Sequence, residues 1–182
     1  GVTTIEEYTF YGCSSLTSIT IPESVTSIGS GAFSYCSSLT DSINIPNGVT
    51  TIGEHTFSGC FSLPSITIPN TVTSIGRSAF LDCSSLTTID IPNSVTTIGD
   101  YAFSGCRRLM SSISIPKGIT TIGELTFYNC SSLPSISIPN SVTSIGRKAF
   151  EYCSSLTSVS IPDSVTNIGE EAFRVCSSLT SV

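Results

Sequence analysis

The sequence predicts an α/β solenoid, a stack of coils that each contain a strand and a short helical turn. The 182 residues divide into eight copies of one unit, and these begin near residues 2, 25, 49, 72, 95, 119, 142 and 165. Successive copies start 23 or 24 residues apart, and their apolar residues recur in register. A fixed period in this range is typical of repeat proteins in which each coil packs only on its neighbours. We therefore expect one domain, residues 1–182, made of eight coils.

The fourth unit, residues 72–94, indicates two extended segments in each coil. Leu86, Ile89 and Ile91 end in the two-residue alternation of a half-buried strand, which we expect to be the main strand of the coil. Val72 and Ile75 indicate a second, shorter extended segment.

The rest of the unit consists of a helical segment and two corners. The spacing of Ala79, Phe80 and Cys83 places these residues on one face of one or two helical turns. Pro92 ends the main strand, at a position where no backbone N–H is needed for hydrogen bonding to the next strand. Gly76 marks the next corner, where we expect a backbone geometry that a Cβ atom would strain.

The unit resembles a known family. Its pattern is Leu-x-x-Ile-x-Ile-Pro-x-x-Val-x-x-Ile-Gly-x-x-Ala-Phe-x-x-Cys-x-x-Leu, read at Leu63, Ile66, Ile68, Pro69, Val72, Ile75, Gly76, Ala79, Phe80, Cys83 and Leu86. This pattern resembles the BspA-like, or Treponema-type, class of leucine-rich repeat over nearly the whole chain. The resemblance implies a right-handed solenoid with a parallel β-sheet on one face. It also implies an extracellular or cell-surface location and adhesion to host or matrix proteins.

Two units carry one extra residue. The insertion lies between Leu39 and Ile43 in the second unit and between Leu109 and Ile113 in the fifth. We expect a β-bulge or a widened start of the strand at each. The two insertions are 70 residues apart, and many other residues of the first three-unit block also recur 70 positions later. We infer that a block of three units was duplicated whole.

Composition and charge exclude several classes of partner. Charged residues make up 11% of the chain, the net charge is −6 and the pI is about 4.5, so we expect no nucleic-acid partner. No apolar run approaches the length of a transmembrane helix, so we expect no membrane insertion. Because the sequence opens and closes inside a unit, we expect it to be a fragment of a longer array, whose uncapped terminal coils favour end-to-end self-association.

The cysteines occur once per unit, at Cys13, Cys36, Cys60, Cys83, Cys106, Cys130, Cys153 and Cys176. Stacked coils would place them in one inward column, where parallel Cβ vectors fit disulfide geometry poorly. We expect buried free thiols, with disulfide pairing as the alternative. No CxxC pair occurs and there is one histidine, His55, so we expect no metal site and no cofactor.

Outward positions are the candidates for function, because packing fixes the inward ones. On the main strand the outward residues are Thr20, Asn44, Thr67, Asp90, Ser114, Ser137 and Ser160. Leucine-rich repeats usually present this face to partners. The alternative is that these small polar residues only keep the strands soluble.

The helical face carries most of the charge and is the second candidate surface. Its candidate contact residues are Arg77, Tyr101, Arg107, Arg108, Tyr128, Arg147 and Tyr152. We expect Arg77 to pair with Glu54 and Asp100, and Arg147 with Glu124 and Glu170, because these residues are about one unit apart. Comparable pairs are expected between Lys148 and Glu171 and between Glu151 and Arg174. These rows of ion pairs would fix the register of one coil on the next, and the tyrosines beside them would suit a binding surface.

No arrangement of nucleophile, base and orienting group appears, so we expect no enzyme activity. Three classes of function remain. The first is a protein-binding or adhesion module with a host, matrix or surface protein as partner. The second is a rigid spacer, and the third, less favoured, is recognition of glycans or ice by rows of Thr and Ser.

Overall fold

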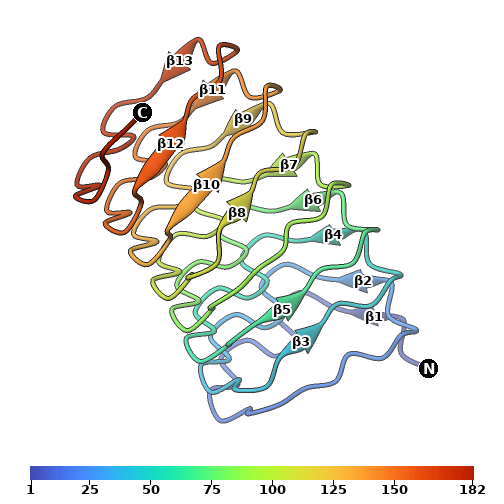
Figure 1. Ribbon diagram of the computed structural model, residues 1–182. Coiled ribbons are helices and arrows are strands. Elements are labelled where there is room, and N and C mark those ends of the chain that lie inside the picture. Colours follow the sequence, from blue (N-terminus) through green and yellow to red (C-terminus); the bar gives the residue numbers. More distant parts are fainter.

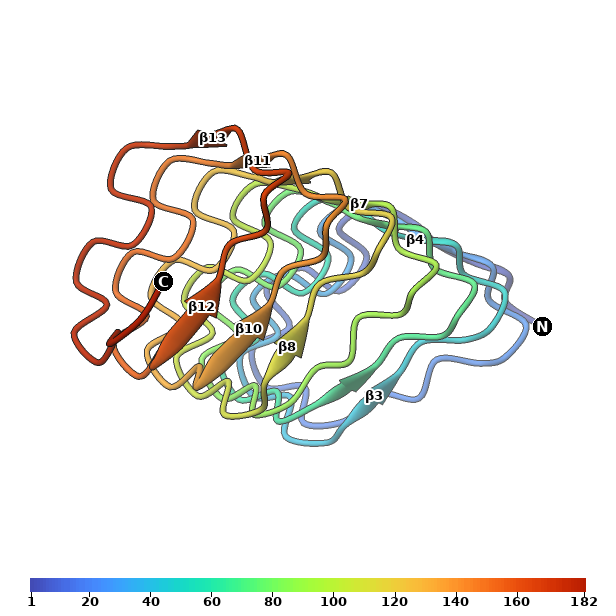
Figure 2. The ribbon, with the colours of Figure 1, turned by 45° about the horizontal axis from the view of Figure 1, so that its top comes forward.

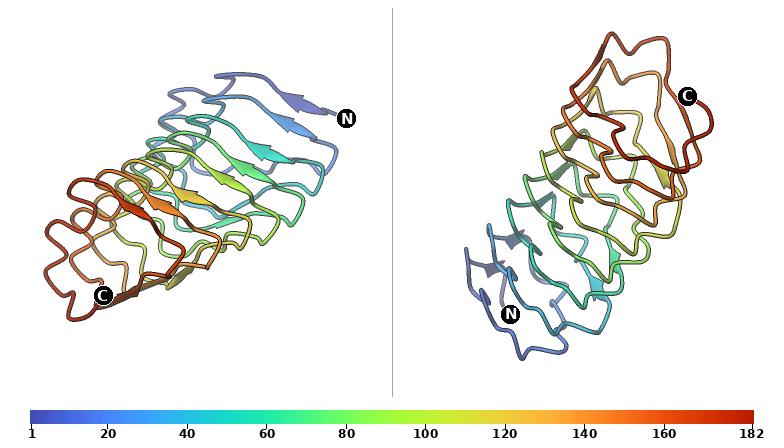
Figure 3. Two further views of the ribbon diagram at one scale, coloured as in Figure 1. Left: turned by 90° about the horizontal axis from the view of Figure 1, so that it is seen from above. Right: turned by 90° about the vertical axis from the view of Figure 1, so that its left-hand side faces the viewer.

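The computed structural model describes residues 1–182 and shows a right-handed parallel β-solenoid (Figures 1 and 2). The chain completes about seven turns rather than the eight coils expected, because the last copy of the unit, residues 165–182, does not close a coil. Each coil lies directly on the preceding one, and the two ends of the chain lie at opposite ends of the stack (Figure 3).

Each unit contributes a very short strand to the first of two parallel ladders, and five units contribute one to the second. The first ladder contains β1 (Thr4–Ile5), β2 (Ser27–Ile28), β4 (Thr51–Ile52), β6 (Ser74–Ile75), β7 (Thr97–Ile98), β9 (Thr121–Ile122), β11 (Ser144–Ile145) and β13 (Asn167–Ile168). The second ladder, formed by the main strands, contains β3 (Ile43–Asn44), β5 (Ile66–Thr67), β8 (Ile113–Ser114), β10 (Ser135–Ser137) and β12 (Ser158–Ser160). All pairs are parallel and join equivalent residues, such as Ile113 with Ile136. Equal positions in successive units therefore form columns.

The core is one continuous column of apolar side chains between the two ladders. It contains 46 buried residues. Phe57, Phe80 and Phe103 are fully buried and stack with ring centroids 5.7 and 5.4 Å apart. The same stacking continues from Phe10 to Phe173. The apolar residues of the repeat thus point inward, as the pattern predicts.

The segment expected to be helical contains no helix. In the fourth unit the N–H groups of Ala79 and Cys83 donate to the carbonyls of Gly76 and Phe80, three residues back, as in consecutive β-turns. Between them, the Phe80 N–H donates to Ala102 of the next coil at 2.8 Å. The helical expectation is wrong because every second N–H group leaves the coil, and an α-helix would keep all of them inside. We call this side of the solenoid the turn face.

These turns need two residues with positive φ in every coil. In the fourth unit they are Ser78 (φ 53°) and Asp82 (φ 57°). Gly59 and Gly105 occupy the second of these positions in the third and fifth units, at φ 71° and 76°. Positive φ costs glycine little, which explains its presence there.

The corner glycines have a different role from the one expected. Gly76 and Gly99 do not have positive φ. A Cβ atom on Gly99 would lie 2.5 Å from the backbone nitrogen of Arg77 in the preceding coil. The corner requires glycine because two coils approach closely there, and not because its own dihedral angles are unusual.

Both ladders are interrupted next to the 24-residue units. The first ladder is broken between β2 and β4 and between β7 and β9. The second ladder has no strand pairing between the first and second units, and none between β8 and the fourth unit. At the first insertion the N–H groups of Thr40 and Asp41 both donate to the carbonyl of Thr17. One inserted residue therefore shifts the strand enough to stop the pairing.

Candidate functional site: the strand face and its grooves

The outward residues of the main strands form the row that the sequence predicts, which we call the strand face. All of its members are exposed, and they are Thr20, Asn44, Thr67, Asp90, Ser114, Ser137 and Ser160. Within a sheet they pair in register, as Ser114 does with Ser137 and Ser137 with Ser160. The row is interrupted at both ladder breaks, so it is not one uniform surface.

Hydroxyl groups bond to one another beside this row. Ser42 Oγ lies 2.6 Å from Ser65 Oγ, and Ser135 Oγ donates to Ser112 Oγ at 2.7 Å. The two pairs are 70 residues apart in sequence, as the block duplication predicts. The sequence indicated the hydroxyls but not that they bind each other, and this pairing leaves fewer of their groups for a partner.

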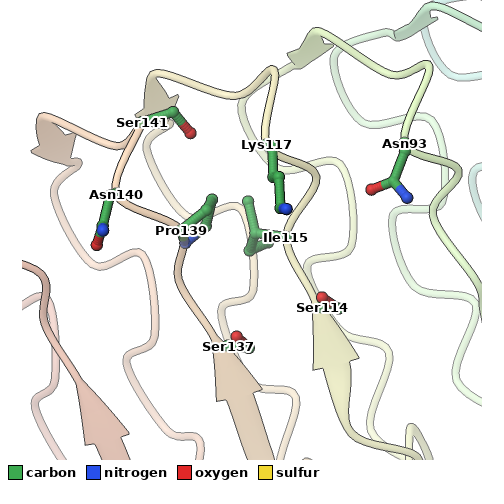
Figure 4. Close-up of a pocket in the computed structure, with 8 residues that line it drawn as sticks. All are labelled: Asn93, Ser114, Ile115, Lys117, Ser137, Pro139, Asn140 and Ser141. Atoms are coloured by element: carbon green, nitrogen blue, oxygen red, sulfur yellow. The ribbon is translucent and has the colours of Figure 1, made fainter.

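Three grooves lie along the strand face. The largest has a volume of about 500 Å3 and is lined by Asn93, Ser114, Ile115, Lys117, Ser137, Pro139, Asn140 and Ser141 (Figure 4). A groove of about 140 Å3 lies between the first two coils, beside Thr20 and Asn44. The third, of about 300 Å3, lies beside Thr67 and Asp90. The sequence alone does not indicate Asn93, Lys117 or Asn140 as a group, because only the stacking of three coils brings them together.

The turn face carries part of the expected ion-pair ladder. Arg147 lies 3.2 Å from Glu124 and 3.6 Å from Glu170, as the spacing predicts. Hydrogen bonding to Glu124 raises the pKa of Arg147. Arg77 pairs only with Asp100, at 4.0 Å, and Glu54 has no ion pair.

The tyrosines of the turn face lie against these charges. The Arg77 guanidinium is 5.0 Å from the centre of the Tyr101 ring. Tyr128 and Tyr152 contact each other edge to face, 5.6 Å apart. By contrast, Arg107 and Arg108 are exposed and form no ion pair.

A buried carboxylate lies within the turn face. The Glu151 side chain is 1% exposed and is held by Lys148 at 3.2 Å and Arg174 at 2.5 Å. Glu171, 2.9 Å from Lys148, completes the cluster. Hydrogen bonding to Glu171 raises the pKa of Lys148, and hydrogen bonding to Lys148 lowers the pKa of Glu171. The sequence predicted the pairs of this cluster but not that Glu151 is buried.

The cysteine column consists of free thiols. Each thiol after the first donates to the carbonyl of a phenylalanine in the preceding coil, as Cys83 does to Phe57 at 3.1 Å. Burial raises the pKa of Cys36 to about 11 and that of Cys60 to about 12. These thiols therefore satisfy buried backbone carbonyls and fill the core.

The parallel ladders, the phenylalanine stack and the cysteine column together define a leucine-rich-repeat solenoid. The family profile described as "BspA type Leucine rich repeat region (6 copies)" matches residues 3–111 and 107–182. The chain belongs to this family. No curated protein matches the chain. The structure contains no helix that could span a membrane.

Three crystal structures are similar to this chain. A leucine-rich repeat protein from T. pallidum is 34% identical with a TM-score of 0.78, over 85% of this chain and 72% of the other. One from Bacteroides ovatus is 31% identical with a TM-score of 0.67, over 100% and 70%. A leucine-rich cell surface protein from Faecalibacterium prausnitzii is 26% identical with a TM-score of 0.52, over 99% and 78%.

Proposed function

We propose that this chain is a non-catalytic protein-binding or adhesion module, and that its strand face binds a host or matrix protein. The observation that carries the proposal is that all three grooves lie on the strand face. They hollow a surface of short polar side chains on a rigid scaffold. Repeat proteins commonly use extended surfaces of this kind for binding.

The same proposal includes display at the cell surface or secretion. Its support is the similar structure from Faecalibacterium prausnitzii, which is described as a leucine-rich cell surface protein. Membership of the BspA-type family agrees with such a location.

The turn face is less suited to a partner. Arg147, Lys148 and Arg174 are already neutralised by neighbouring carboxylates, and binding there would have to displace these pairs. Among the candidate contact residues of the turn face, Arg107 and Arg108 are the only cations without an ion pair.

Recognition of ice by the Thr and Ser rows is disfavoured by the ladder breaks. A periodic solid ligand needs a regular array, and the strand pairing that would keep the row regular is absent between Thr20 and Asn44 and between Asp90 and Ser114. A measurement of thermal hysteresis should find none.

The experiment that tests the proposed function compares the two faces. The chain is immobilised, and its binding to purified extracellular-matrix proteins is measured by surface plasmon resonance. Thr67→Arg and Ser137→Arg each place a long cation on the exposed strand face and should abolish binding while leaving the fold intact. Glu54→Arg places the same side chain on the turn face, where Glu54 has no ion pair, and serves as the control.

Two outcomes would contradict the proposal. Binding that is lost in Glu54→Arg but kept in both strand-face variants would assign the turn face. If no matrix protein and no host cell binds the chain, the rigid spacer is the better assignment, and the continuous phenylalanine stack would then be its main functional feature.

A further inference from the structure

The largest groove differs in chemistry from an ordinary peptide-binding groove. Hydroxyl and amide side chains dominate its lining, among them Asn93, Asn140, Ser114 and Ser137, and Ile115 and Pro139 are its apolar members. Its volume of about 500 Å3 is within the range of small-molecule sites. It lacks the Trp and Tyr anchors that protein hot spots favour. Such a lining suits a ligand that itself carries many hydroxyl groups.

One cation and no carboxylate line the groove. Lys117 extends from the corner after β8 toward Ile115, between Asn93 and Pro139 (Figure 4). It is exposed and takes part in no ion pair. In a chain of net charge −6, an unpaired lysine in a groove favours an anionic group at that point.

An unsatisfied hydroxyl also belongs to this groove. Ser94 and Ser164, one coil before Lys117 and two coils after it, donate their hydroxyls to backbone carbonyls at 2.6 and 2.7 Å. The equivalent Ser141 has no hydrogen-bond partner, although its oxygen is buried. A buried hydroxyl without a partner is destabilising, and because Ser141 lines the groove, turning its side chain toward a ligand hydroxyl would satisfy it.

The duplicated block provides an internal comparison. Residues 70 positions earlier are Glu23 in place of Asn93, Asn47 in place of Lys117 and Thr71 in place of Ser141. Thr71 donates its hydroxyl to Val49 at 2.9 Å. The earlier copy thus has a carboxylate, no cation and no free hydroxyl, so the features above belong to the later copy alone.

We propose that this groove binds an acidic saccharide, a sugar that carries a carboxylate, with Lys117 pairing with the carboxylate and the Ser and Asn side chains bonding the sugar hydroxyls. A peptide with an acidic side chain would offer the same charge but fewer hydroxyls for the Ser and Asn side chains to bond. The groove shares Ser114 and Ser137 with the strand face, so a bound saccharide would compete with the proposed protein partner for this part of the surface.

The test uses a disaccharide that contains glucuronate and the matched disaccharide in which that carboxylate is reduced to a hydroxymethyl group. Binding to the whole chain is measured by NMR titration of backbone amides. The acidic sugar should shift the backbone amides of Ser114, Lys117, Ser137 and Asn140, and should bind about tenfold more tightly than the neutral one, as expected for a hydrogen bond to a charged group. Lys117→Asn, which installs the residue of the earlier copy, should remove this difference. Arg108→Asn removes a positive charge outside the groove and should not.

Several results would overturn the assignment. They are equal affinity for the two sugars, shifts confined to other residues, unchanged binding in Lys117→Asn, and no binding up to about 10 mM, where even weak sugar sites are occupied. A short peptide with one glutamate that shifts the same amides and binds more tightly than the sugar would show a peptide site instead.

Discussion

Each inner phenylalanine of the column is stacked between two others. Phe80 is fully buried, and its ring lies nearly parallel to those of Phe57 and Phe103, at interplanar angles of 4° and 6°. If such a ring is removed, neighbouring side chains cannot move in to fill the space, because the coils above and below hold them in place.

Phe80→Ala should therefore lower the free energy of unfolding by roughly 3–5 kcal/mol, the usual cost of emptying a core site of this size. Urea denaturation measures this loss. Thr67→Ala, on the exposed strand face, should change stability by less than about 0.5 kcal/mol. An unchanged midpoint for Phe80→Ala would show that its ring is not in the core.

The cysteine column predicts how stability depends on pH. Thiols of the unfolded chain ionise near pH 9.0, whereas burial raises the pKa of Cys36 to about 11 and that of Cys60 to about 12. Above pH 9 the unfolded chain binds fewer protons than the folded one, so stability should fall as pH rises from about 9 to about 12. Thermal denaturation between pH 7 and 11 measures this, and Cys60→Ala should make the fall shallower. A stability independent of pH in this range would mean that the thiols are accessible in the folded state.

At the scale of single residues, the sequence predicts for most side chains whether they point into the core or toward solvent. The inward positions of Phe80 and Cys83 follow from register alone, and so does the outward position of Thr67. The burial of Glu151 does not, because Lys148 and Arg174 reach it only once the coils have stacked. Lys117 was missed for the same reason, since Asn93 and Asn140 belong to the coils on either side.

At the scale of the elements, spacing between coils decides what each corner tolerates. A Cβ atom on Gly99 would lie 2.5 Å from backbone of the preceding coil, whereas one on Gly53 would meet nothing closer than 3.4 Å. Gly53 follows the 24-residue second unit, at the break between β2 and β4. The insertion thus loosens the corner of the next coil.

Gly99→Ala should consequently destabilise the protein by about 1–3 kcal/mol, as overpacking does. Gly53→Ala is the matched control and should be neutral within about 0.5 kcal/mol or slightly stabilising. Calorimetric melting of the two variants gives the comparison. Equal losses would argue that the corners depend on dihedral freedom and not on contact between coils.

The sequence predicts the strands but not the turns. Alternation at Ile66 and Ile68 indicates strand β5 correctly, because it reflects one buried face. The strand expected at Ile89 and Ile91 is not formed, and the fourth unit keeps only an isolated bridge between Thr88 and Ser65. The spacing of Ala79, Phe80 and Cys83 is common to a helix and to consecutive turns, and only bonding to the next coil decides between them. The same long-range bonding fixes where the ladders break.

At the scale of the whole molecule, the two terminal coils expose residues that inner coils bury. Val2 is 59% exposed and Ile168 48%, whereas Val72 is fully buried and Ile75 is 1% exposed. Exposed apolar groups of this kind favour association.

The 182 residues on their own should therefore associate end to end as their concentration rises. Sedimentation velocity should show a growing mass, and Ile168→Lys should reduce it by placing a charge at one contact surface. A mass that stays at 19.1 kDa at every concentration would exclude association through these coils.

The central claim is that equivalent residues of successive units lie above one another, so that inward columns form the fold and outward columns form the binding surface. Spin labels at Thr20 and Ser160, in a chain with Cys13→Ser and Cys176→Ser, test it by pulsed electron paramagnetic resonance. The two sites lie six coils apart on the strand face, and a strand spacing of about 4.8 Å per coil predicts one narrow distance distribution near roughly 30 Å. A broad distribution, or one centred well beyond that distance, would contradict the stacking on which the fold and both proposed binding surfaces depend.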